Sequence, residues 1–371
     1  SGNPTVFNTK QVDFDGTDDY MNVGVLPNSF TTAFTVSAWV WTDAGSGAYQ
    51  IISTGQGAFS QIYQIGTGLK LDIGGGTNYN AVIDADYFDT AHQNTWVYLA
   101  LVYNGATIKA YRNGIEVGSA ALSGTLNSIS QEANIGRYHG GSEYWNGKMS
   151  QIGLFSSALT ADEVSSLYNH GLPIDLTTNQ AAYTSSSNLV GYWRMGSGTL
   201  DSYPLIADQT NATLGSELVT NGDFELNSGW LNFGSPTTSE QSTEQSHTGT
   251  YSWKIIADAT QEGIFSPNNF NLTSGLTYSV SLWIYSVSGN SIKSGLTNTN
   301  VSVFAERTVT VGEWTNITYI ATASSTGAAY ISILSQNSLN FFVDDVSIKQ
   351  VNGNPAIMTN QTASDIENGS P

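Results

Sequence analysis

The sequence predicts an all-β protein with two antiparallel β-sandwich domains and one short helix near residues 160–170. Apolar and polar side chains alternate along "FTVSAWVWT" (residues 34–42), as expected for a strand with one face in a core. Asn104-Gly105 and Asn113-Gly114 interrupt a longer strand-like stretch, and both dipeptides favour two-residue hairpin turns. Abundant Gly, Ser, Thr and Asn with only 11% charged residues are typical of many short strands joined by polar turns.

The one expected helix lies within "LTADEVSSLYNHG" (159–171). Thr160 is the predicted N-cap, Glu163 completes a capping box with it, and Gly171 would end the helix. We expect a structural helix that covers an edge or an end of the strands and carries no chemistry.

The charge balance excludes two classes of partner. Thirty acidic and eleven basic residues give a net charge of −19, which repels nucleic-acid phosphates and anionic lipid headgroups, so no nucleic-acid partner is expected. A membrane-spanning helix needs about 18 consecutive apolar residues, and no apolar run in the sequence is nearly that long, so we expect no membrane insertion.

The sequence contains no cysteine. A secreted eukaryotic β-protein of this size would usually carry disulfides, so we expect a bacterial surface protein or a virion protein that folds in a reducing cytoplasm. The chain starts with Ser1 rather than Met, which we interpret as processing or as excision from a longer protein.

The first β region resembles a known family. "VDFDGTDDYMNVG", "FTVSAWVWT", "TWVYLALVYNGATIKAYRNGIEVG" and the segment from "ANIGRYHGG" to "SLYNHG" occur in the order found in laminin-G-like, concanavalin A-like jelly rolls. The resemblance covers residues 10–172 and implies a jelly-roll domain over residues 1–187. The sequence departs from the family at "GKMSQIGLF", where Ser150 and Gln151 replace a frequent acidic pair.

The second β region resembles the jelly-roll carbohydrate-binding modules that are often appended to xylanases and cellulases. "LVTNGDFELNSGW", "HTGTYSWKI", "VTVGEWTNITYIAT" and "NFFVDDVSI" carry this resemblance across residues 217–349. It implies a β-sandwich domain over residues 216–350 that is inserted into the first fold.

Two segments flank the expected insertion. "NLVGYWRMGSG" (188–198) resembles the opening strand of another laminin-G-like repeat, and its usual continuation, "AIMTNQTASDI", appears only at 356–366. Residues 188–215 therefore either return a strand to the first domain, which we favour because an isolated strand leaves an exposed edge, or begin a further repeat. Residues 351–371 form a C-terminal segment. The motifs at 188–198 and 356–366 also resemble virion fibre or surface proteins of marine bacteriophages.

The acidic stretch "DFDGTDDY" (13–20) is not an EF-hand loop. If Asp13 is position one, the required glycine and the bidentate glutamate would fall on Asp18 and Gly24. We interpret the stretch as a corner between two strands, with Phe14 and Tyr20 pointing inward and aspartates capping the turn. Calcium binding is the alternative, with these ligands: Asp15, Asp18 and Asp19.

Modules like the second domain commonly hold a structural calcium where their first and last strands meet. The resemblance places its ligands on Glu225, on Asp344 or Asp345, and on carbonyls of the turn 247–252. Neighbouring residues of a strand face opposite sides, so only one of Asp344 and Asp345 would serve. Oxygen ligands suit calcium, which is the cofactor that we expect.

We predict no enzymatic activity. Glycosidases on the concanavalin A-like fold carry Glu-x-Asp-x-x-Glu on one strand, and retaining hydrolysis needs two carboxylates about 5 Å apart. "VIDADYFD" supplies Asp84 and Asp86 without a glutamate, and the four histidines lack the spacing of a zinc site.

Sugar binding would use aromatic rings as platforms for the C–H face of a pyranose. Several tryptophans fall where the two families place core or strand-end aromatics: Trp39, Trp96, Trp145, Trp283 and Trp314. The rings without such a role are the candidate glycan-binding residues: Trp41, Tyr63, Tyr79, Tyr138, Tyr144 and Tyr285. Ordinary surface aromatics are the alternative interpretation of these residues.

We therefore predict a virion surface or fibre protein, homo-oligomeric and in contact with other virion proteins, that binds host or environmental glycans. A purely structural virion decoration protein is one alternative. The other is a secreted or surface-bound bacterial adhesin, or the accessory region of a polysaccharide-degrading enzyme. Exposed aromatics clustered in one place would favour sugar binding, and exposed aliphatic patches would favour assembly.

Overall fold

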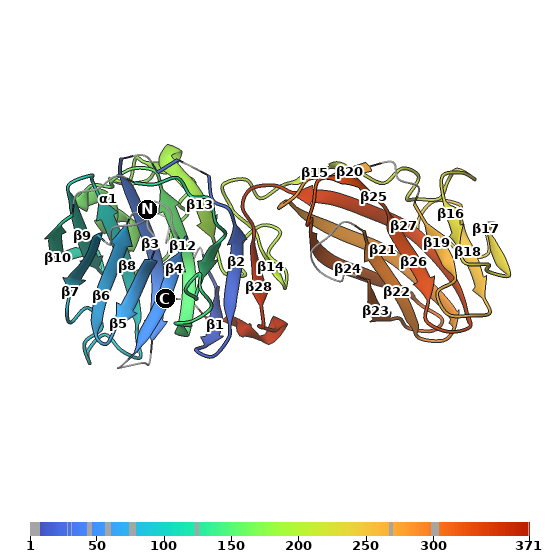
Figure 1. The fold of residues 1–371 in the computed structure, drawn as a ribbon, viewed down its shortest axis with the longest axis horizontal. Coiled ribbons are helices and arrows are strands. Elements are labelled where there is room, and N and C mark those ends of the chain that lie inside the picture. The colour runs from blue at the N-terminus through green and yellow to red at the C-terminus, as the bar shows by residue number, and fades with distance from the viewer. Residues whose placement is uncertain are drawn as a thin grey trace. The chain divides into compact units, whose positions relative to one another are not determined.

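The computed structural model describes residues 8–371 apart from residues 28, 31, 43–46, 56–60, 74–78, 123–125, 267–269, 298–303 and 370, and the side chains of residues 79–82. The chain divides into two compact units. The first unit comprises Ser1–Thr213 and Asn352–Pro371, and the second comprises Leu214–Val351. Both units are antiparallel β-sandwiches, which confirms the predicted fold class (Figure 1).

The first unit contains two eight-stranded sheets. One sheet has the order β10-β9-β8-β3-β12-β1-β29, with β13 also paired to β12. Its strands are β1 (Lys10–Asp15), β3 (Phe34–Thr42), β8 (Trp96–Tyr103), β9 (Thr107–Arg112), β10 (Ile115–Ala121), β12 (Asn146–Phe155), β13 (Leu189–Trp193) and β29 (Ile366–Asn368).

The other sheet of the first unit has the order β14-β28-β2-β11-β4-β5-β6-β7. Its strands are β2 (Tyr20–Gly24), β4 (Ala48–Ser53), β5 (Gln61–Ile65), β6 (Gly68–Ile73), β7 (Tyr79–Asp84), β11 (Ala133–Ile135), β14 (Leu205–Ile206) and β28 (Ala356–Thr359).

The core of the first unit lies between these sheets. The alternate positions Phe34, Val36, Ala38 and Val40 of β3 are all buried in it, as the sequence pattern predicted. Trp39 points to the opposite side of β3, where it packs in a smaller apolar cluster with residues of the helix. The hairpins β8–β9 and β9–β10 turn at the two predicted Asn-Gly dipeptides.

The predicted helix is α1 (Ala161–Tyr168), and its capping box is present. Val164 and Leu167 are buried in the cluster that contains Trp39. The helix ends earlier than predicted, because Asn169 adopts the left-handed conformation (φ 43°) that was expected of Gly171. Three short 3-10 turns complete the helical elements in the described part of the chain: η1 (Asn169–Gly171), η2 (Ser186–Asn188) and η3 (Ala363–Asp365). No helix in the described residues is long and apolar enough to cross a membrane.

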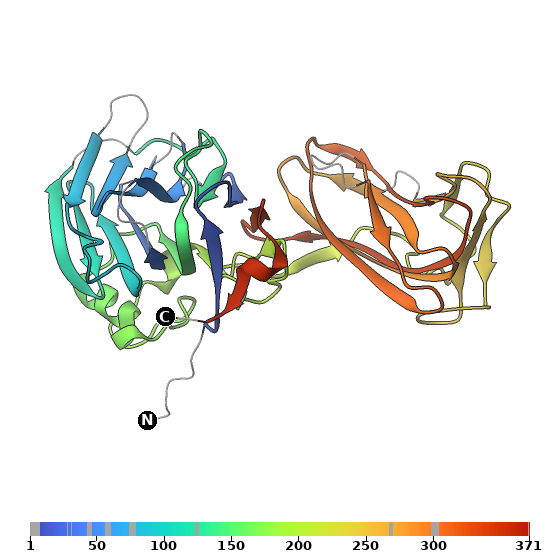
Figure 2. The ribbon, with the colours of Figure 1, turned by 90° about the horizontal axis from the view of Figure 1, so that it is seen from below.

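The chain leaves and re-enters the first unit at neighbouring points. The N–H of Asn352 donates to the carbonyl of Thr213 at 3.0 Å. The buried carboxylate of Asp208 binds both flanking segments, accepting from the N–H groups of Tyr192 and Asn354. After re-entry, β28 pairs with β2 and β29 pairs with β1, so the red C-terminal segment lies beside the blue N-terminal strands (Figure 2). The strand β13 returns to the first unit, where it lies against β12.

The second unit packs a six-stranded sheet against a five-stranded sheet. The six-stranded sheet has the order β17-β18-β27-β21-β24, with β15 paired to β27. Its strands are β15 (Leu214–Glu217), β17 (Thr238–Ser242), β18 (Ser252–Ala257), β21 (Thr277–Ser288), β24 (Trp314–Thr322) and β27 (Leu339–Val351).

The five-stranded sheet has the order β16-β19-β26-β22-β23. Its strands are β16 (Leu231–Phe233), β19 (Gly263–Phe265), β22 (Ser291–Leu296), β23 (Ala305–Thr308) and β26 (Ile331–Ser335). A separate two-stranded ribbon joins β20 (Phe270–Leu272) to β25 (Gly327–Ala329). Buried side chains from both larger sheets form a single core, with Ile284 and Val343 from one and Ile264 and Ile333 from the other.

Candidate functional site

The outer face of the five-stranded sheet carries a cluster of rings and apolar side chains. Ile264 and Ile333 point into the core, so their neighbours along β19 and β26 point outward. We call this surface the five-stranded face and define it by Leu231, Phe233, Phe265, Phe304 and Tyr330.

Three rings of the five-stranded face contact one another. Phe265 meets Phe233 edge-on at a centroid distance of 6.3 Å, and it meets Tyr330 at 5.5 Å. Phe233 is 37% exposed and Phe304 is 38% exposed, which is unusual for side chains of this size. The rings are thus both assembled and accessible.

Small residues lie between these rings. Phe265 pairs with Ser332 across β19 and β26, and Ser332 pairs with Gly295 across β26 and β22. Phe304 lies directly on Gly295, because a Cβ atom on that glycine would stand 2.3 Å from Cδ2 of Phe304. Two small, buried residues, Ser332 and Gly295, therefore separate Phe265 from Phe304.

Charged and polar side chains border the five-stranded face. Lys293 pairs with Glu306 across β22 and β23. Glu306 accepts hydrogen bonds from the Ser291 hydroxyl at 2.5 Å and the Gln336 amide at 3.0 Å, and these bonds lower its pKa. Flat apolar rings beside fixed polar groups are the combination that a sugar requires, because a sugar has both a C–H face and hydroxyls.

Tyr285, a predicted glycan-binding residue, lies on the other sheet of the second unit. It is half-buried in β21 and pairs with Trp314 and Phe342 on the neighbouring strands. Trp283, predicted to be a core or strand-end ring, is instead half-buried in the middle of β21 on the same outer side.

The candidates in the first unit do not form one cluster. Trp41 is half-buried with the Lys148 amine 6.0 Å from its ring centre, whereas Tyr63 is only 6% exposed. Tyr138 and Tyr144 share one loop, in which the Tyr144 hydroxyl donates to a nearby carbonyl. Among the described rings, no contact joins any two of these four residues. Tyr79 belongs to β7, and its side chain lies outside the described residues.

Sequence reasoning missed the residues of the five-stranded face. "GIF" (263–265) contains two adjacent apolar residues, and alternation alone does not tell which of Ile264 and Phe265 faces the core. Phe304 lies just before β23, and Tyr330 lies between β25 and β26. In the sequence, a small residue stands directly beside each of these large rings, and this difference in size was the signal available.

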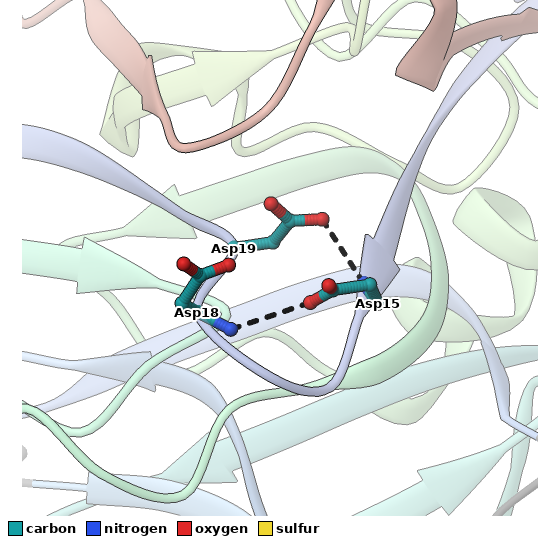
Figure 3. A group of neighbouring side chains, drawn as sticks. All are labelled: Asp15, Asp18 and Asp19. Atoms are coloured by element: carbon teal, nitrogen blue, oxygen red, sulfur yellow. Dashed lines mark hydrogen bonds between the residues drawn. The ribbon is translucent and has the colours of Figure 1, made fainter.

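The acidic turn between β1 and β2 brings three carboxylates together (Figure 3). The oxygens of Asp15, Asp18 and Asp19 lie within 4.8 Å of one another, and of the three residues only Asp19 is buried. Asp15 caps the turn by accepting from the N–H groups of Thr17 (2.8 Å) and Asp18 (3.3 Å). Burial raises the pKa of Asp19 to about 6, although its carboxylate accepts from the Asp15 N–H. These bonds are those of an aspartate-capped turn.

One expectation for this corner is wrong. Phe14 is buried in the core as predicted, but Tyr20 is not part of the core. Met21 takes the inward position of β2, and the Tyr20 ring lies outside, stacked under the Arg137 guanidinium at 3.5 Å. The alternation of β2 is shifted by one residue from the expected one.

The predicted calcium ligands of the second unit converge on one turn. Glu225 accepts from the N–H groups of Thr250 (2.7 Å) and Tyr251 (2.8 Å). Asp344 is fully buried, accepts from the His247 N–H at 2.8 Å, and has its pKa raised to about 6 by burial. Asp345 binds the His247 ring instead, with Oδ2 2.6 Å from Nδ1. These carboxylate oxygens lie around one turn, and oxygen is the donor atom that calcium prefers.

Each unit matches a different protein family. Residues 15–165 match the concanavalin A-like lectin/glucanases superfamily. Residues 216–338, which include the whole five-stranded face, match a carbohydrate binding domain family. The domain descriptions inferred from the sequence are therefore confirmed.

Individual relatives cover parts of the chain. Endo-1,4-beta-xylanase Y of Acetivibrio thermocellus is 28% identical over 142 residues, which are 35% of this chain and 13% of the xylanase. A candidate carbohydrate-binding protein of Bacteroides ovatus is 20% identical in sequence, with a TM-score of 0.42 over 55% of this chain and 56% of that one. A xylan-binding domain from Paenibacillus barcinonensis is 16% identical, with a TM-score of 0.32 over 38% of this chain and 99% of the domain.

Proposed function

We propose that the protein acts by binding, not by catalysis, and that its second unit binds a neutral polysaccharide on the five-stranded face. The observation that carries this proposal is the group of rings on either side of Ser332 and Gly295, of which Phe233 and Phe304 are exposed. Sugar rings would stack on Phe265 and Phe304, and polar groups at the border would bind hydroxyls. The match of residues 216–338 to a carbohydrate binding domain supports this assignment.

The ligand of the five-stranded face is expected to be uncharged. A net charge of −19 repels acidic polysaccharides in the same way as it repels nucleic acids. The similarity to a xylanase makes xylan the first polymer to test. Single contacts would be weak, and display of several copies together, the homo-oligomer predicted from the sequence, would supply avidity.

The test is retention of the purified chain on insoluble xylan, measured for the wild type and for Phe265→Ala and Phe304→Ala. Loss of one stacked ring should weaken binding about tenfold, which corresponds to about 1.5 kcal/mol. Tyr20→Ala is the matched control, because it removes a half-buried ring of the first unit that is not a candidate glycan-binding residue. Equal retention of all four proteins, each shown to be folded by its melting transition, would refute the assignment to this face.

We also propose that a structural calcium ion binds at the turn 247–252. Glu225 and Asp344 would be its carboxylate ligands, since both already point at this turn. The ion would tie β27 to the turn that precedes β18 and would stabilise the sandwich.

We also propose in which kind of protein this polysaccharide binding takes place. The similarity to a xylanase favours an accessory region of a polysaccharide-degrading enzyme, or a related secreted bacterial adhesin. Display on a virion surface beside other virion proteins remains a prediction from the short phrases at 188–198 and 356–366. Adhesion of the labelled chain to xylan particles but not to bacterial cells would favour the enzyme setting, and the reverse would favour host attachment.

A further inference from the structure

The second unit has another ring-covered surface on the opposite side of its core. We call it the six-stranded face and define it by these residues: His247, Trp283, Tyr285 and Trp314. Phe342 adjoins this face but is only 2% exposed. Tyr285 stands at its centre, paired with Trp314 of β24 on one side and Phe342 of β27 on the other. The same row of directly paired residues continues across the sheet from Phe342 to Lys254 of β18 and then to Glu240 of β17.

The rings of this face form a continuous series. Tyr285 lies 5.7 Å from Trp314 and 6.2 Å from Phe342, measured between ring centroids. His247 lies 5.6 Å from Trp314 and stacks on Trp283 at 3.8 Å with an interplanar angle of 16°. Both tryptophans and Tyr285 are half-buried, so part of each ring is accessible.

Fixed hydrogen bonds hold the series in place. The His247 ring binds Asp345 at 2.6 Å, and its backbone N–H donates to Asp344 at 2.8 Å. Only 24% of the His247 side chain is exposed. A ligand that docks here does not have to order mobile side chains, and this lowers the entropic cost of binding.

The charges around the six-stranded face select its ligand. Lys254 lies over the Phe342 ring at 5.7 Å, and its amine is paired with Glu244 at 2.5 Å. Glu240 and Asp345 add negative charge at the border, and this charge repels an acidic polymer. Ring surfaces bordered by hydroxyl-binding carboxylates fit a neutral sugar chain.

We propose that the six-stranded face is a second binding surface for a neutral polysaccharide, so that one chain can bridge two polysaccharide strands. This inference rests on the proposed function for the class of ligand, but it uses different residues. The core of the second unit separates the two faces, so both can be occupied at once.

The two faces differ in their fluorescence. The six-stranded face contains Trp283 and Trp314, whereas the defining residues of the five-stranded face include no tryptophan. Titration of the full chain with xylohexaose should therefore change tryptophan fluorescence when the six-stranded face binds. Tyr285→Ala should weaken this response about tenfold, whereas the control Tyr285→Phe keeps the ring and the response. Phe265→Ala should leave the response unchanged.

Bridging gives an independent readout. The wild type should increase the turbidity of soluble xylan, and either Tyr285→Ala or Phe265→Ala should abolish this increase while one face still binds. A fluorescence response with unchanged affinity in Tyr285→Ala would overturn the inference, and so would the absence of a response in the wild type. Xylan retention that depends on Phe265 would then still support the proposed function. Concentration-dependent sedimentation lost in Tyr285→Ala would show that a second copy covers the face, and it would also overturn the inference.

Discussion

Phe304 rests on the backbone of Gly295, so closely that a Cβ atom at residue 295 would stand 2.3 Å from the phenylalanine ring and 2.6 Å from its Cα. The ring remains 38% exposed on its other side. The glycine thus sets the height of an accessible ring above the sheet.

Gly295→Ala should displace Phe304 and weaken xylan binding several-fold, because the ring no longer lies at the level of Phe265. The substitution should also lower the stability of the second unit, since the added Cβ would stand 2.6 Å from the backbone Cα of Phe304 and the strand must shift. Gly215→Ala is the matched control, because a Cβ there meets its nearest atom at an ordinary 3.4 Å. Retention on insoluble xylan measures the effect. Equal binding by Gly295→Ala and Gly215→Ala would show that the position of Phe304 does not matter.

Thr160→Ala should destabilise the first unit by about 1 kcal/mol, because the substitution removes an N-cap. The Thr160 hydroxyl accepts from the Glu163 N–H at 3.2 Å, and the Glu163 carboxylate accepts from the Thr160 N–H at 2.9 Å. Hydrogen exchange of residues 161–168 reports the local loss. Ser165→Ala, an exposed position of the same helix, should leave exchange unchanged or slow it. Unaltered exchange in Thr160→Ala would contradict the role of the cap.

Asp19 should make the first unit more stable as the pH falls from about 6 to about 4. Burial raises its folded pKa to about 6 from an ordinary 3.8, so the folded state takes up a proton before the unfolded state does. Asp19→Asn does not titrate, and the wild type should therefore gain stability relative to this variant over that range. Parallel urea unfolding of both proteins at several pH values measures the difference. A difference that is constant with pH would rule out the raised pKa.

Calcium should raise the melting temperature of the second unit, since a ligand that binds only the folded state stabilises it by an amount that grows with the logarithm of its free concentration. Glu225→Gln should remove this effect, because it takes away one of the two carboxylates that point at the turn 247–252. The effect should also fade as the pH drops below about 6, where the Asp344 carboxylate becomes protonated.

Asp15→Asn is the control for the calcium prediction, because it removes a carboxylate of the acidic turn in the first unit. Calorimetric scans with calcium and with a chelator distinguish the two sites. Calcium stabilisation that is lost in Asp15→Asn and kept in Glu225→Gln would assign the calcium site to the acidic turn instead.

The sequence by itself determined the features that local chemistry encodes. The alternation in β3, the Asn-Gly hairpins and the capping box of α1 each depend on residues a few positions apart, and all three are present. Where two nearby residues could serve the same role, local chemistry was insufficient. Asn169 ended the helix in place of Gly171, and Met21 took the core position expected for Tyr20.

The ring-covered faces were decided by the tertiary structure. Tyr285 could be selected from the sequence, but its contacts with Trp314 and Phe342 come from strands that are distant along the chain. Trp283 looked like a core or strand-end residue until the pairing of β21 placed it on the outer side. Phe304 gains its role only from the small residue beneath it. Local pattern fixes which residues alternate, whereas packing of two sheets decides which side of each strand is buried and which rings meet on the side that is left.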